Sequence, residues 1–444
     1  MSLDREQQTE PLTHERALLD SYNRAGRPAR EHKVGLEHEK LLFHRLTGAP
    51  VAYEGAEGIQ ALLEAIAPHG YTAFREAPER PPIALTRGIE AISLEPGGQF
   101  ELSGSPFPTA REAHAENLRH VAELKAAAGP LQLLPVALGY RPNASVDEMS
   151  WMPKSRYRMM REVLPERGGL ARDMMLLTAT GQVSLDWVDE ADCAKKVTLV
   201  ARLTPVLVAL YANSPLRLGK PSGFQSFRSH VWSDVDPARC GYFPAMLDGT
   251  FSFQSYVDWA LAAPLLFLRR RGEYLRPKIT FRQLLENGFE QKPALASDWV
   301  DHLSTLFPEV RIKRVLEVRG ADCASVAMTG GLGALFRGLL YDAQALSDAA
   351  QIVPQLGYAE HLEFHVLAQR QGLHGSLRGK SLATMAQEMV ALARAGLERL
   401  DPADAPLLDV LAAQAERGES PAVDVLAAWE SKKDVPGFLE KFAL

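Results

Sequence analysis

The sequence is poor in the features that mark several common classes of protein. It has three cysteines in 444 residues, Cys193, Cys240 and Cys323, and they are too far apart for a CxxC pair or a zinc-site spacing. This pattern argues against a disulfide framework and fits a reducing compartment. The most apolar helical stretches are short or are interrupted by Arg202 and Pro264. We therefore expect no segment that spans a membrane, and no membrane partner.

Two common nucleotide-binding motifs are also missing. The chain has no GxxxxGK[ST] loop and no GxGxxG, so neither a P-loop nor a Rossmann nucleotide site is expected. The formal net charge of −6 gives no reason to expect nucleic acid or an anionic membrane as a partner. The first residues lack the apolar core of a signal peptide and, with Asp4, Glu6 and Glu10, are too acidic for a transit peptide. These observations predict a cytoplasmic location.

The composition is that of an ordinary globular protein with a large core, at 46% hydrophobic and 23% charged residues. We find no internal repeat, and no stretch rich in Pro, Gly or Ser divides the chain. The pattern favours one α+β body with a helical C-terminal part. We expect a helical N-terminal segment over 1–30, a catalytic α+β body over 31–345, and a helical part over 346–444 packed on the same body.

The stretch Ile92–Gly104 organises the rest of this interpretation. Two short runs of alternating apolar and polar residues flank Pro-Gly-Gly, which is typical of a strand with one buried face and an irregular centre. Glycine pairs permit a bulge or a close approach of the backbone to a ligand. The spacing predicts a kinked strand that sets Glu95 and Glu101 around one hollow.

Three other segments repeat this pattern of an apolar face opposite charged or polar residues, and a fourth, Gln225–Asp236, carries several charged residues. We expect strands over Lys33–Phe43, Met175–Trp187 and Val310–Val318, and a mixture of strand and loop over Gln225–Asp236. Asp322 is a candidate cap of the helix that follows it. The polar residues on the four segments are, in chain order, Glu37, Glu39, Gln182, Ser184, Arg228, Glu317 and Arg319.

If the strands pair in one sheet, five carboxylates gather on one concave face. Two like charges about 4 Å apart repel by roughly 4 kcal/mol at an effective dielectric constant near 20. Either several of these groups are protonated or cations neutralise them. Carboxylate oxygens suit Mg²⁺ or Mn²⁺, and Mg²⁺ takes one or two carboxylates together with substrate phosphates. The pattern therefore favours two or three ions that bridge a polyphosphate to the protein, as phosphoryl transfer requires.

A plainer interpretation stays open at this point. A strand with one polar face is often the solvated surface of an antiparallel sheet, and Glu37 with Glu39 fits that as well. Arg319 could simply be an ion-pair partner of Glu317, and Arg228 a surface residue. Periodicity alone supports no more than a metal-dependent enzyme that acts on a phosphorylated or carboxylated small molecule.

The same segments resemble the plant-type glutamate–cysteine ligases, a branch also present in many bacteria. The similarity runs from about residue 30 to 345 and is weaker in the helical tail. The EPGGQFELSG and LEVRGAD segments are specific to the family. The segments that carry the resemblance are VGLEHEK (34–40), ISLEPGGQFELSG (92–104), MPKSRY (152–157), DMM (173–175), QVSLD (182–186), ANSP (212–215), GKP (219–221), RSHVW (228–232) and FPEVRIKRVLEVRGAD (307–322).

The resemblance implies a glutamine-synthetase-like fold, with a curved, mostly antiparallel sheet that forms a funnel and is wrapped by helices. It implies that ATP is a co-substrate, that two or three Mg²⁺ ions take part with Mn²⁺ as a possible substitute, and that L-glutamate and L-cysteine are the substrates. The implied reaction passes through γ-glutamyl phosphate and is the first step of glutathione biosynthesis. A monomer and a homodimer are both compatible with the sequence.

The resemblance also assigns roles by motif position. Arg228, Arg319 and Glu317 are implied at the catalytic centre, where a planar guanidinium can grip a carboxylate or phosphate at two points. The implied metal ligands are Glu37, Glu39, Glu95, Glu101 and Glu317. The implied substrate-binding residues are Arg228, Arg319, Gln182, Ser184 and Tyr157, and the implied ATP-binding residues are Lys154, Arg156 and Lys220.

The chain departs from the family pattern at two places. Ser184 stands where the family often has asparagine, and Cys323-Ala324-Ser325 replaces the usual glycines. Two alternatives to a glutamate–cysteine ligase therefore stay open: a γ-glutamyl ligase with another amine acceptor, and a catalytically silent homologue that binds a nucleotide or an amino acid. The cysteines associated with redox control in the plant enzymes have no clear counterpart here.

Overall fold

An open antiparallel sheet of nine strands forms the centre of the computed structural model, which describes residues 10–270 and 272–444. The predicted α+β class with an antiparallel sheet is confirmed, although the sheet is not closed and ends at β14 and β2. In order across the sheet the strands are β14 (Val310–Ile312), β15 (Leu316–Asp322), β7 (Thr180–Leu185), β1 (Val34–His44), β5 (Phe100–Ser103), β4 (Glu90–Leu94), β3 (Ala84–Arg87) and β2 (Thr72–Phe74), with β6 (Leu133–Val136) paired to the end of β1.

Helices and small hairpins surround the sheet. The α-helices are α1 (Arg16–Asn23), α2 (Ile59–Ile66), α3 (Ala110–Ala128), α4 (Ser155–Val163), α5 (Ala171–Leu177), α6 (Glu190–Tyr211), α7 (Phe227–Trp232), α8 (Ala245–Asp248), α9 (Phe253–Ala262), α10 (Phe281–Asn287), α11 (Ala296–Leu303), α12 (Val326–Tyr341), α13 (Ala343–Ala349), α14 (Tyr358–Gln371), α15 (Leu382–Leu400), α16 (Asp409–Arg417), α17 (Pro421–Glu430) and α18 (Val435–Glu440). The two-stranded pairs are β8 (Leu216–Arg217) with β9 (Lys220–Pro221), β10 (Cys240–Gly241) with β13 (Phe307–Pro308), β11 (Leu268–Arg270) with β12 (Glu273–Leu275), and β16 (Ser376–Leu377) with β17 (Lys380–Ser381).

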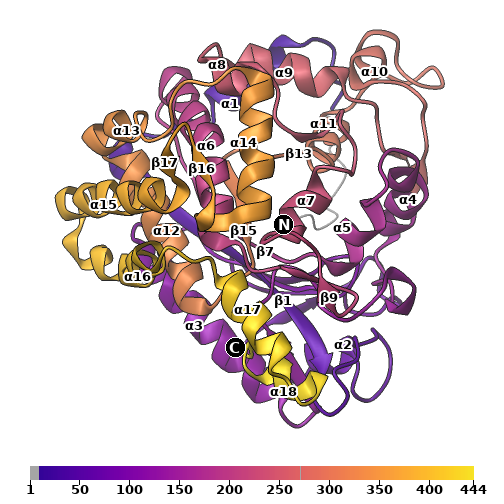
Figure 1. Cartoon of the computed structure of the whole chain (residues 1–444). Helices are drawn as coiled ribbons and strands as arrows, with labels where there is room; N and C mark the ends of the chain where they lie inside the picture. Colours follow the sequence, from indigo (N-terminus) through magenta and orange to yellow (C-terminus); the bar gives the residue numbers. More distant parts are fainter. Residues whose placement is uncertain (1–9, 271) are drawn as a thin grey trace.

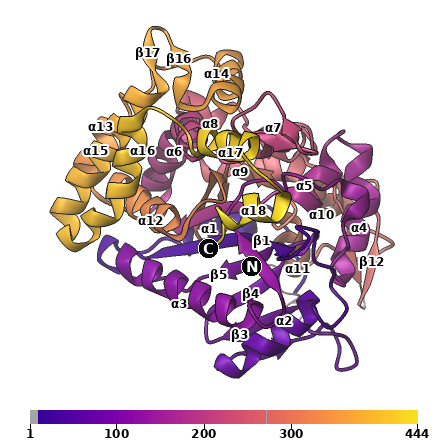
Figure 2. The same cartoon turned by 60° about the horizontal axis from the view of Figure 1, so that its bottom comes forward.

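Alternation along β1 decides which face of the sheet is covered. Leu36 and His38 point away from the acidic side chains, and a Cβ added to Gly333 of α12 would lie 3.0 Å from the Leu36 side chain. Both α12 and α3 pack on this face. Figure 1 shows α13, α15 and α16, in orange and yellow, on one side of the molecule and α4 and α5, in magenta, on the other, and Figure 2 shows α3 running alongside β5. The opposite face of the sheet is thereby left to the candidate site.

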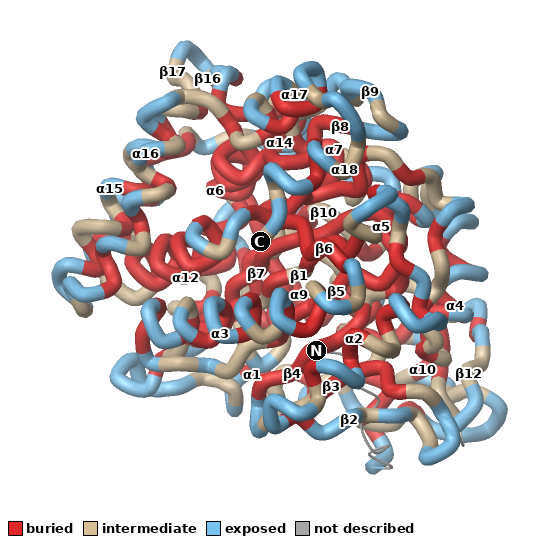
Figure 3. The backbone as a smooth tube through the Cα atoms, turned by 90° about the horizontal axis from the view of Figure 1, so that it is seen from below, coloured by how far each residue is buried: buried red, intermediate tan, exposed pale blue. Residues whose placement is uncertain are grey.

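The cores on the two sides of the sheet include the C-terminal helices. Leu41 and Phe43, at the end of β1, belong to one apolar cluster with Val425 of α17 and Phe438 of α18. The strands β1 and β7 and the helices α6 and α12 form the buried centre in Figure 3, and exposed segments lie around it. The division at residues 30 and 345 stays a prediction, and residues 1–9, with Asp4 and Glu6, lie outside the described part of the chain.

Several local expectations are confirmed. The Thr109 hydroxyl accepts from the backbone N–H of Glu112, whose carboxylate bonds Thr109 in return, so a capping box opens α3. The helical character from residue 325 onward is also found, with breaks at Pro354 and Pro402 among others. Within 10–270 and 272–444, no helix is both long and apolar enough to cross a membrane.

Other local expectations are wrong. The stretch Ile92–Gly104 is not one kinked strand: β4 and β5 are neighbours in the sheet, joined by a tight loop. Within 175–187, residues up to Leu177 belong to α5, because four buried apolar residues in a row fit a helix as well as a strand. Residues 310–318 form the hairpin β14–β15, and Arg228 stands on the helix α7. Ser325, not Asp322, caps α12.

We predict that Gly97→Ala destabilises the protein by about 2 kcal/mol, because a side chain cannot be accommodated there. A Cβ at this position would lie 2.3 Å from the carbonyl oxygen of Leu176, and the obstacle is backbone. The measurement is the thermal unfolding temperature of the purified variant. Gly357→Ala is the matched control, since a Cβ there meets nothing within 4 Å. Equal unfolding temperatures for the two variants would contradict the packing of this loop on α5.

Candidate active site

A cavity of about 100 Å³ lies over the uncovered face of the sheet. Antiparallel pairing places Glu39 of β1 opposite Glu101 of β5, and Glu37 opposite Gln182 of β7. The residues that line the cavity are Glu37, Glu39, Glu95, Pro96, Gln99, Glu101, Arg156, Tyr157, Met160, Met174, Met175, Thr178, Thr180, Gln182, Arg228, Trp232, Ser304, Phe307, Arg311, Lys313 and Arg319.

The acidic side of this cavity is strongly desolvated. Burial raises the pKa of Glu39 well above its usual range, and the charges of Glu95 and Glu101 add to the effect. Burial, followed by the charge of Glu101, raises the pKa of Glu95 to about 7. Burial also raises the pKa of Glu37. Glu37, Glu39 and Glu95 are half-buried and line the cavity, so they do not form an open, solvated sheet surface.

The loop between β4 and β5 holds Glu95 in place. The backbone N–H of Glu95 donates to the carbonyl of Gln99 at 3.0 Å, and the N–H of Gly98 donates to the carbonyl of Glu95 at 2.9 Å. Gly98 has a φ of +80°, which favours glycine. The Gln99 amide ties the loop to α5 through the carbonyls of Met175 and Thr178. The Pro-Gly-Gly loop therefore fixes the position of Glu95 and its carboxylate.

The carboxylate of Glu101 is held by hydroxyl groups. Ser93 Oγ donates to Oε2 at 2.6 Å and Ser103 Oγ donates to Oε1 at 3.0 Å. Its neighbour Glu39 accepts from the backbone N–H of Thr180 at 2.9 Å. Each of these bonds leaves oxygen lone pairs available for a further partner, because an ionised carboxylate can accept about four hydrogen bonds.

Glu317 has a different environment from the other glutamates. Its carboxylate lies 2.5 Å from Arg311 Nε, 3.3 Å from Lys313 Nζ and 3.6 Å from Arg319 Nη1. Burial alone would raise the pKa of Glu317, but Arg311, Lys313 and Arg319 together lower it far below its usual range. The structure thus pairs Glu317 with three cations of the protein.

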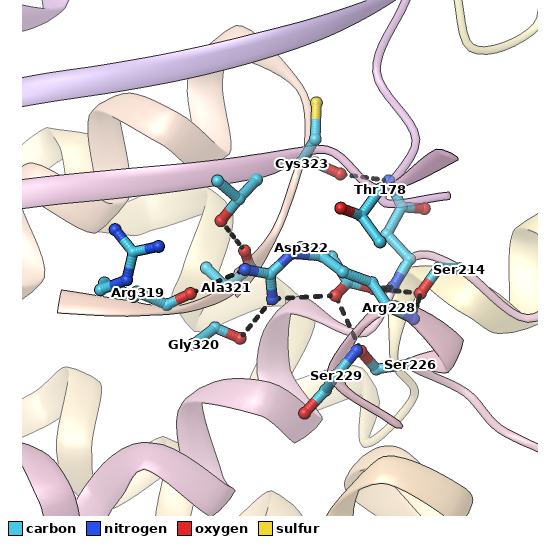
Figure 4. Close-up of polar contacts among 12 residues, drawn as sticks. Thr178, Ser214, Ser226, Arg228, Ser229, Arg319, Gly320, Ala321, Asp322 and Cys323 are labelled. Carbon is cyan, nitrogen blue, oxygen red and sulfur yellow. Dashed lines mark hydrogen bonds and ion pairs between the residues drawn. The ribbon is translucent and has the colours of Figure 1, made fainter. Parts of the chain in front are cut away.

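The two arginines expected at the catalytic centre both line the cavity. Arg319 Nη1 donates to Gln182 Oε1 at 2.5 Å, and Arg228 Nη2 donates to the carbonyl of Arg319 at 2.9 Å. Figure 4 shows the Arg228 guanidinium among the backbone carbonyls of β15 and the carboxylate of Asp322. Arg228 Nε is buried and has no hydrogen-bond partner among the described residues. The Nε–H group of Arg228 is therefore, within the described chain, an unsatisfied hydrogen-bond donor at the wall of a cavity that could hold a small anion.

A third arginine faces the cavity from α4. Arg156 Nη2 donates to Ser304 Oγ at 3.1 Å, and its buried Nε has no partner within the part of the chain that is described. Tyr157 also lines the cavity, but its hydroxyl already donates to the carbonyl of Leu94 at 2.6 Å. Lys154 Nζ donates to the same carbonyl at 2.5 Å.

Four of the expected site residues are not part of this cavity wall: Lys154, Ser184, Lys220 and Glu317. Ser184 is half-buried on β7, opposite Glu317 in register, and Lys220 is exposed on β9. The sequence interpretation in turn missed Arg311 and Lys313. The signal was present, because both residues alternate along β14 and its turn, and Arg311 pairs with Glu317 across the β14–β15 hairpin.

The donor set fits divalent ions by chemistry. Glu39 and Glu101 lie opposite each other and have lone pairs to spare, and carboxylate oxygens of this kind are the ligands that Mg²⁺ and Mn²⁺ prefer. Within the described ranges, however, no three acidic, histidine or cysteine side chains already stand in a metal-binding group. The acidic side chains would have to draw together around an ion.

A larger cavity of about 820 Å³ lies elsewhere, between α6, α12 and α13. Its buried cation, Lys196, already pairs with Asp192 at 2.7 Å and donates to the carbonyl of Asp186. The smaller cavity is therefore the better candidate site, because it concentrates desolvated acids and unmet arginine donors.

The fold and the cavity together define a class: an α+β protein whose open antiparallel sheet carries a pocket lined by acidic side chains and arginines. The fold is similar to that of a glutamate–cysteine ligase from Francisella tularensis solved in complex with AMP. The TM-score is 0.56 at 11% identity, over 93% of this chain and 87% of that one.

The sequence comparisons define the family. The chain is 38% identical to the chloroplastic glutamate–cysteine ligase of Brassica juncea over 420 residues, 93% of this chain and 80% of the relative. It is 35% identical to glutamate–cysteine ligase B, chloroplastic, of Oryza sativa subsp. japonica, over 96% of this chain and 86% of the relative. The profile of glutamate–cysteine ligase family 2 matches residues 33–436. The chain belongs to this family.

We predict opposite effects on stability for two neighbouring carboxylates. Glu317→Gln should lower the free energy of unfolding by about 3 kcal/mol, because it leaves the buried Arg311 and the half-buried Lys313 and Arg319 without their shared partner. Glu39→Gln should leave stability unchanged or raise it in the ligand-free protein, because it removes a desolvated charge. Urea unfolding of both variants and the wild type provides the measurement.

The pH dependence of the Glu39 effect follows from the same pKa shift. A pKa that is raised in the folded state costs stability as the pH rises above the unfolded value of about 4.3. The gain from Glu39→Gln should therefore be larger at pH 8 than at pH 5. A Glu39→Gln variant that loses as much stability as Glu317→Gln would contradict this account.

Proposed function

We propose that the protein is an ATP-dependent glutamate–cysteine ligase that joins the γ-carboxylate of L-glutamate to the amine of L-cysteine. This is the first step of glutathione biosynthesis. The observation that carries the proposal is the meeting, in one cavity of a member of this family, of buried acids with arginines that have unmet donors. A catalytically silent homologue is less compatible with this, because uncompensated buried charge destabilises a protein that gains nothing from it.

The unmet donors fit the charged groups of the substrates. Arg228 Nε and Arg156 Nε are both buried, and an anion that reached them would satisfy two otherwise costly N–H groups. Arg319 lines the same wall beside Gln182. In the proposal, Arg228 and Arg319 hold the glutamate carboxylate and the transferred phosphoryl group, while Arg156 faces the phosphates of ATP.

The acidic strands serve the other half of the reaction. Glu37, Glu39, Glu95 and Glu101 would hold Mg²⁺, and Glu317 would contribute where its arginine and lysine partners release it. The ions, when bound, neutralise the phosphates and the developing charge of phosphoryl transfer. Glu37, Glu39 and Glu101 stand on paired strands and Glu95 on the loop that joins two of them, so the fold would hold these carboxylates in place for the ions. The reaction then proceeds through γ-glutamyl phosphate, with rate gained from positioning and charge neutralisation.

One wall of the cavity suits a small amine acceptor with an apolar side chain. Met160, Met174 and Met175 lie there with Trp232 and Phe307, and the sulfur atoms of methionine are polarisable and adapt to a thiol. The cavity of about 100 Å³ is below the usual range for whole ligands, so the adenosine of ATP must lie toward its open side.

We also propose a cytoplasmic location, although the plant relatives carry chloroplastic in their names. All three cysteines are free, which fits a reducing compartment. The oligomeric state, a monomer or a homodimer, stays a prediction.

The proposal predicts ADP release that requires glutamate, cysteine and Mg²⁺ together, measured with a coupled assay on the purified protein. Glu101→Gln should reduce turnover by about a hundredfold or more while the circular dichroism spectrum is unchanged. Glu57→Gln is the control, because Glu57 is an exposed glutamate. A wild type that releases no ADP with all three present would refute the proposed function, and full activity in Glu101→Gln would refute the metal role.

A γ-glutamyl ligase with another acceptor is the second candidate, because Ser184 stands where the family often has asparagine. An amine panel at fixed glutamate distinguishes the two. We predict that cysteine has the highest kcat/KM and exceeds serine by about tenfold or more, since a thiol packs better than a hydroxyl against the methionine side chains and aromatic rings of this wall. Another amine that clearly outperforms cysteine would establish the second candidate instead.

A further inference from the structure

Asp322 is a buried carboxylate that the proposed chemistry does not use. It stands at the end of β15, is 1% exposed, and lies outside the cavity wall. Burial raises its pKa, and Arg228 and the donors around it oppose that rise. The backbone N–H of Asn213 donates to Oδ2 at 2.8 Å, Ser214 Oγ donates to Oδ2 at 2.6 Å, and Ser226 Oγ donates to Oδ1 at 2.7 Å.

The two serines connect Asp322 to the start of α7. A serine hydroxyl has one proton, so a hydroxyl that donates to Asp322 can only accept from its other neighbours. Ser214 Oγ accepts from the backbone N–H of Arg228 at 3.0 Å, and Ser226 Oγ accepts from that of Ser229 at 3.2 Å. The carboxylate thus orients both hydroxyls and, through them, the first turn of the helix that carries Arg228.

Asp322 also lies beside the Arg228 side chain. Its Oδ1 is 3.8 Å from Arg228 Nη1, which donates to the carbonyl of Gly320 at 3.5 Å. Figure 4 shows the aspartate between the two serines and the guanidinium. Both the backbone and the side chain of Arg228 are therefore linked to the carboxylate of Asp322.

We propose that Asp322 is the positioning residue of Arg228. It anchors the first turn of α7 through Ser214 and Ser226, and from behind the cavity wall its charge holds the guanidinium in place. The inference rests on the proposed role of Arg228 in gripping the carboxylate of glutamate. Asp322 itself touches no substrate in this scheme.

The test is a double-mutant cycle. Asp322→Asn keeps the shape but removes the charge and disturbs the direction of one hydroxyl. We expect it to raise the KM for glutamate about tenfold and to leave the KM for ATP within about twofold. In an Arg228→Lys background, Asp322→Asn should add less than about twofold, because both changes remove the same interaction. Losses that multiply in the double variant would overturn the inference.

Asp404→Asn is the matched control for the loss of a buried aspartate. Asp404 is fully buried, accepts from the backbone N–H groups of Ala110 and Arg111, and pairs with Arg337 at 3.0 Å. The variant Asp404→Asn should lower the unfolding temperature without changing the KM for glutamate. If it changes that KM as much as Asp322→Asn does, the effect is one of stability and the inference fails.

Two further measurements cover failure to fold and failure of the proposed function. Ser226→Ala removes one of the two tethers and should show a smaller rise of the same KM; an unchanged KM would contradict the tether. A crystal structure of Asp322→Asn needs no turnover and should show the Arg228 guanidinium moved from the carbonyl of Arg319. An unmoved guanidinium overturns the inference even if the wild type proves inactive with glutamate and cysteine, an outcome that would refute the proposed function separately.

Discussion

Repulsion between buried carboxylates is the constraint on which this structure depends. Glu39 and Glu101 stand directly opposite each other on neighbouring antiparallel strands, a placement that destabilises a sheet when both are charged. Glu95 joins them from the loop between β4 and β5, and burial, with the charges of the neighbouring glutamates added to it, raises the pKa of both Glu39 and Glu95. A fold can hold such groups only if the surrounding packing is strong enough to enforce their positions. Here the enforcement comes from the other face of the sheet, where α3 and α12 bury the apolar side of β1.

The cations that answer this charge come from the second half of the chain. Arg311, Lys313 and Arg319 belong to the β14–β15 hairpin, which joins the sheet at the opposite side from β4 and β5, with β7 and β1 between. These three cations surround Glu317 and balance its negative charge. The charges of Glu39 and Glu95 are not balanced in this way. The two ends of the cavity therefore differ in charge. Unbalanced carboxylates lie toward β4 and β5, and arginine side chains lie toward α7 and β15. A substrate pair of metal-bound polyphosphate and amino-acid carboxylate matches that polarity.

Alternation predicted the acidic faces of β1 and β5 because the side-chain period of a strand is visible in sequence. The β4–β5 hairpin was missed because Pro-Gly-Gly fits a bulge and a tight loop equally, and only pairing decides between them. The β14–β15 hairpin was missed for a similar reason: its turn, around Lys313, contains neither glycine nor proline. Two of the three cations around Glu317, Arg311 and Lys313, were missed with it. The place of Arg228 was out of reach, since the helix α7 is only six residues long and depends on Ser214 and Asp322 from distant segments.

Asp322 and Glu39 illustrate how a buried acid can be assigned to structure or to chemistry. Both are desolvated, and burial raises the pKa of both. Asp322 accepts from three donors and faces an arginine, so its charge is satisfied inside the protein and serves to order α7. Glu39 accepts from a single backbone N–H of the described chain and faces two other acids, so its charge is left for something that binds. The difference lies in the donors supplied by the fold, and it separates the residue that positions the site from the residue that awaits a ligand.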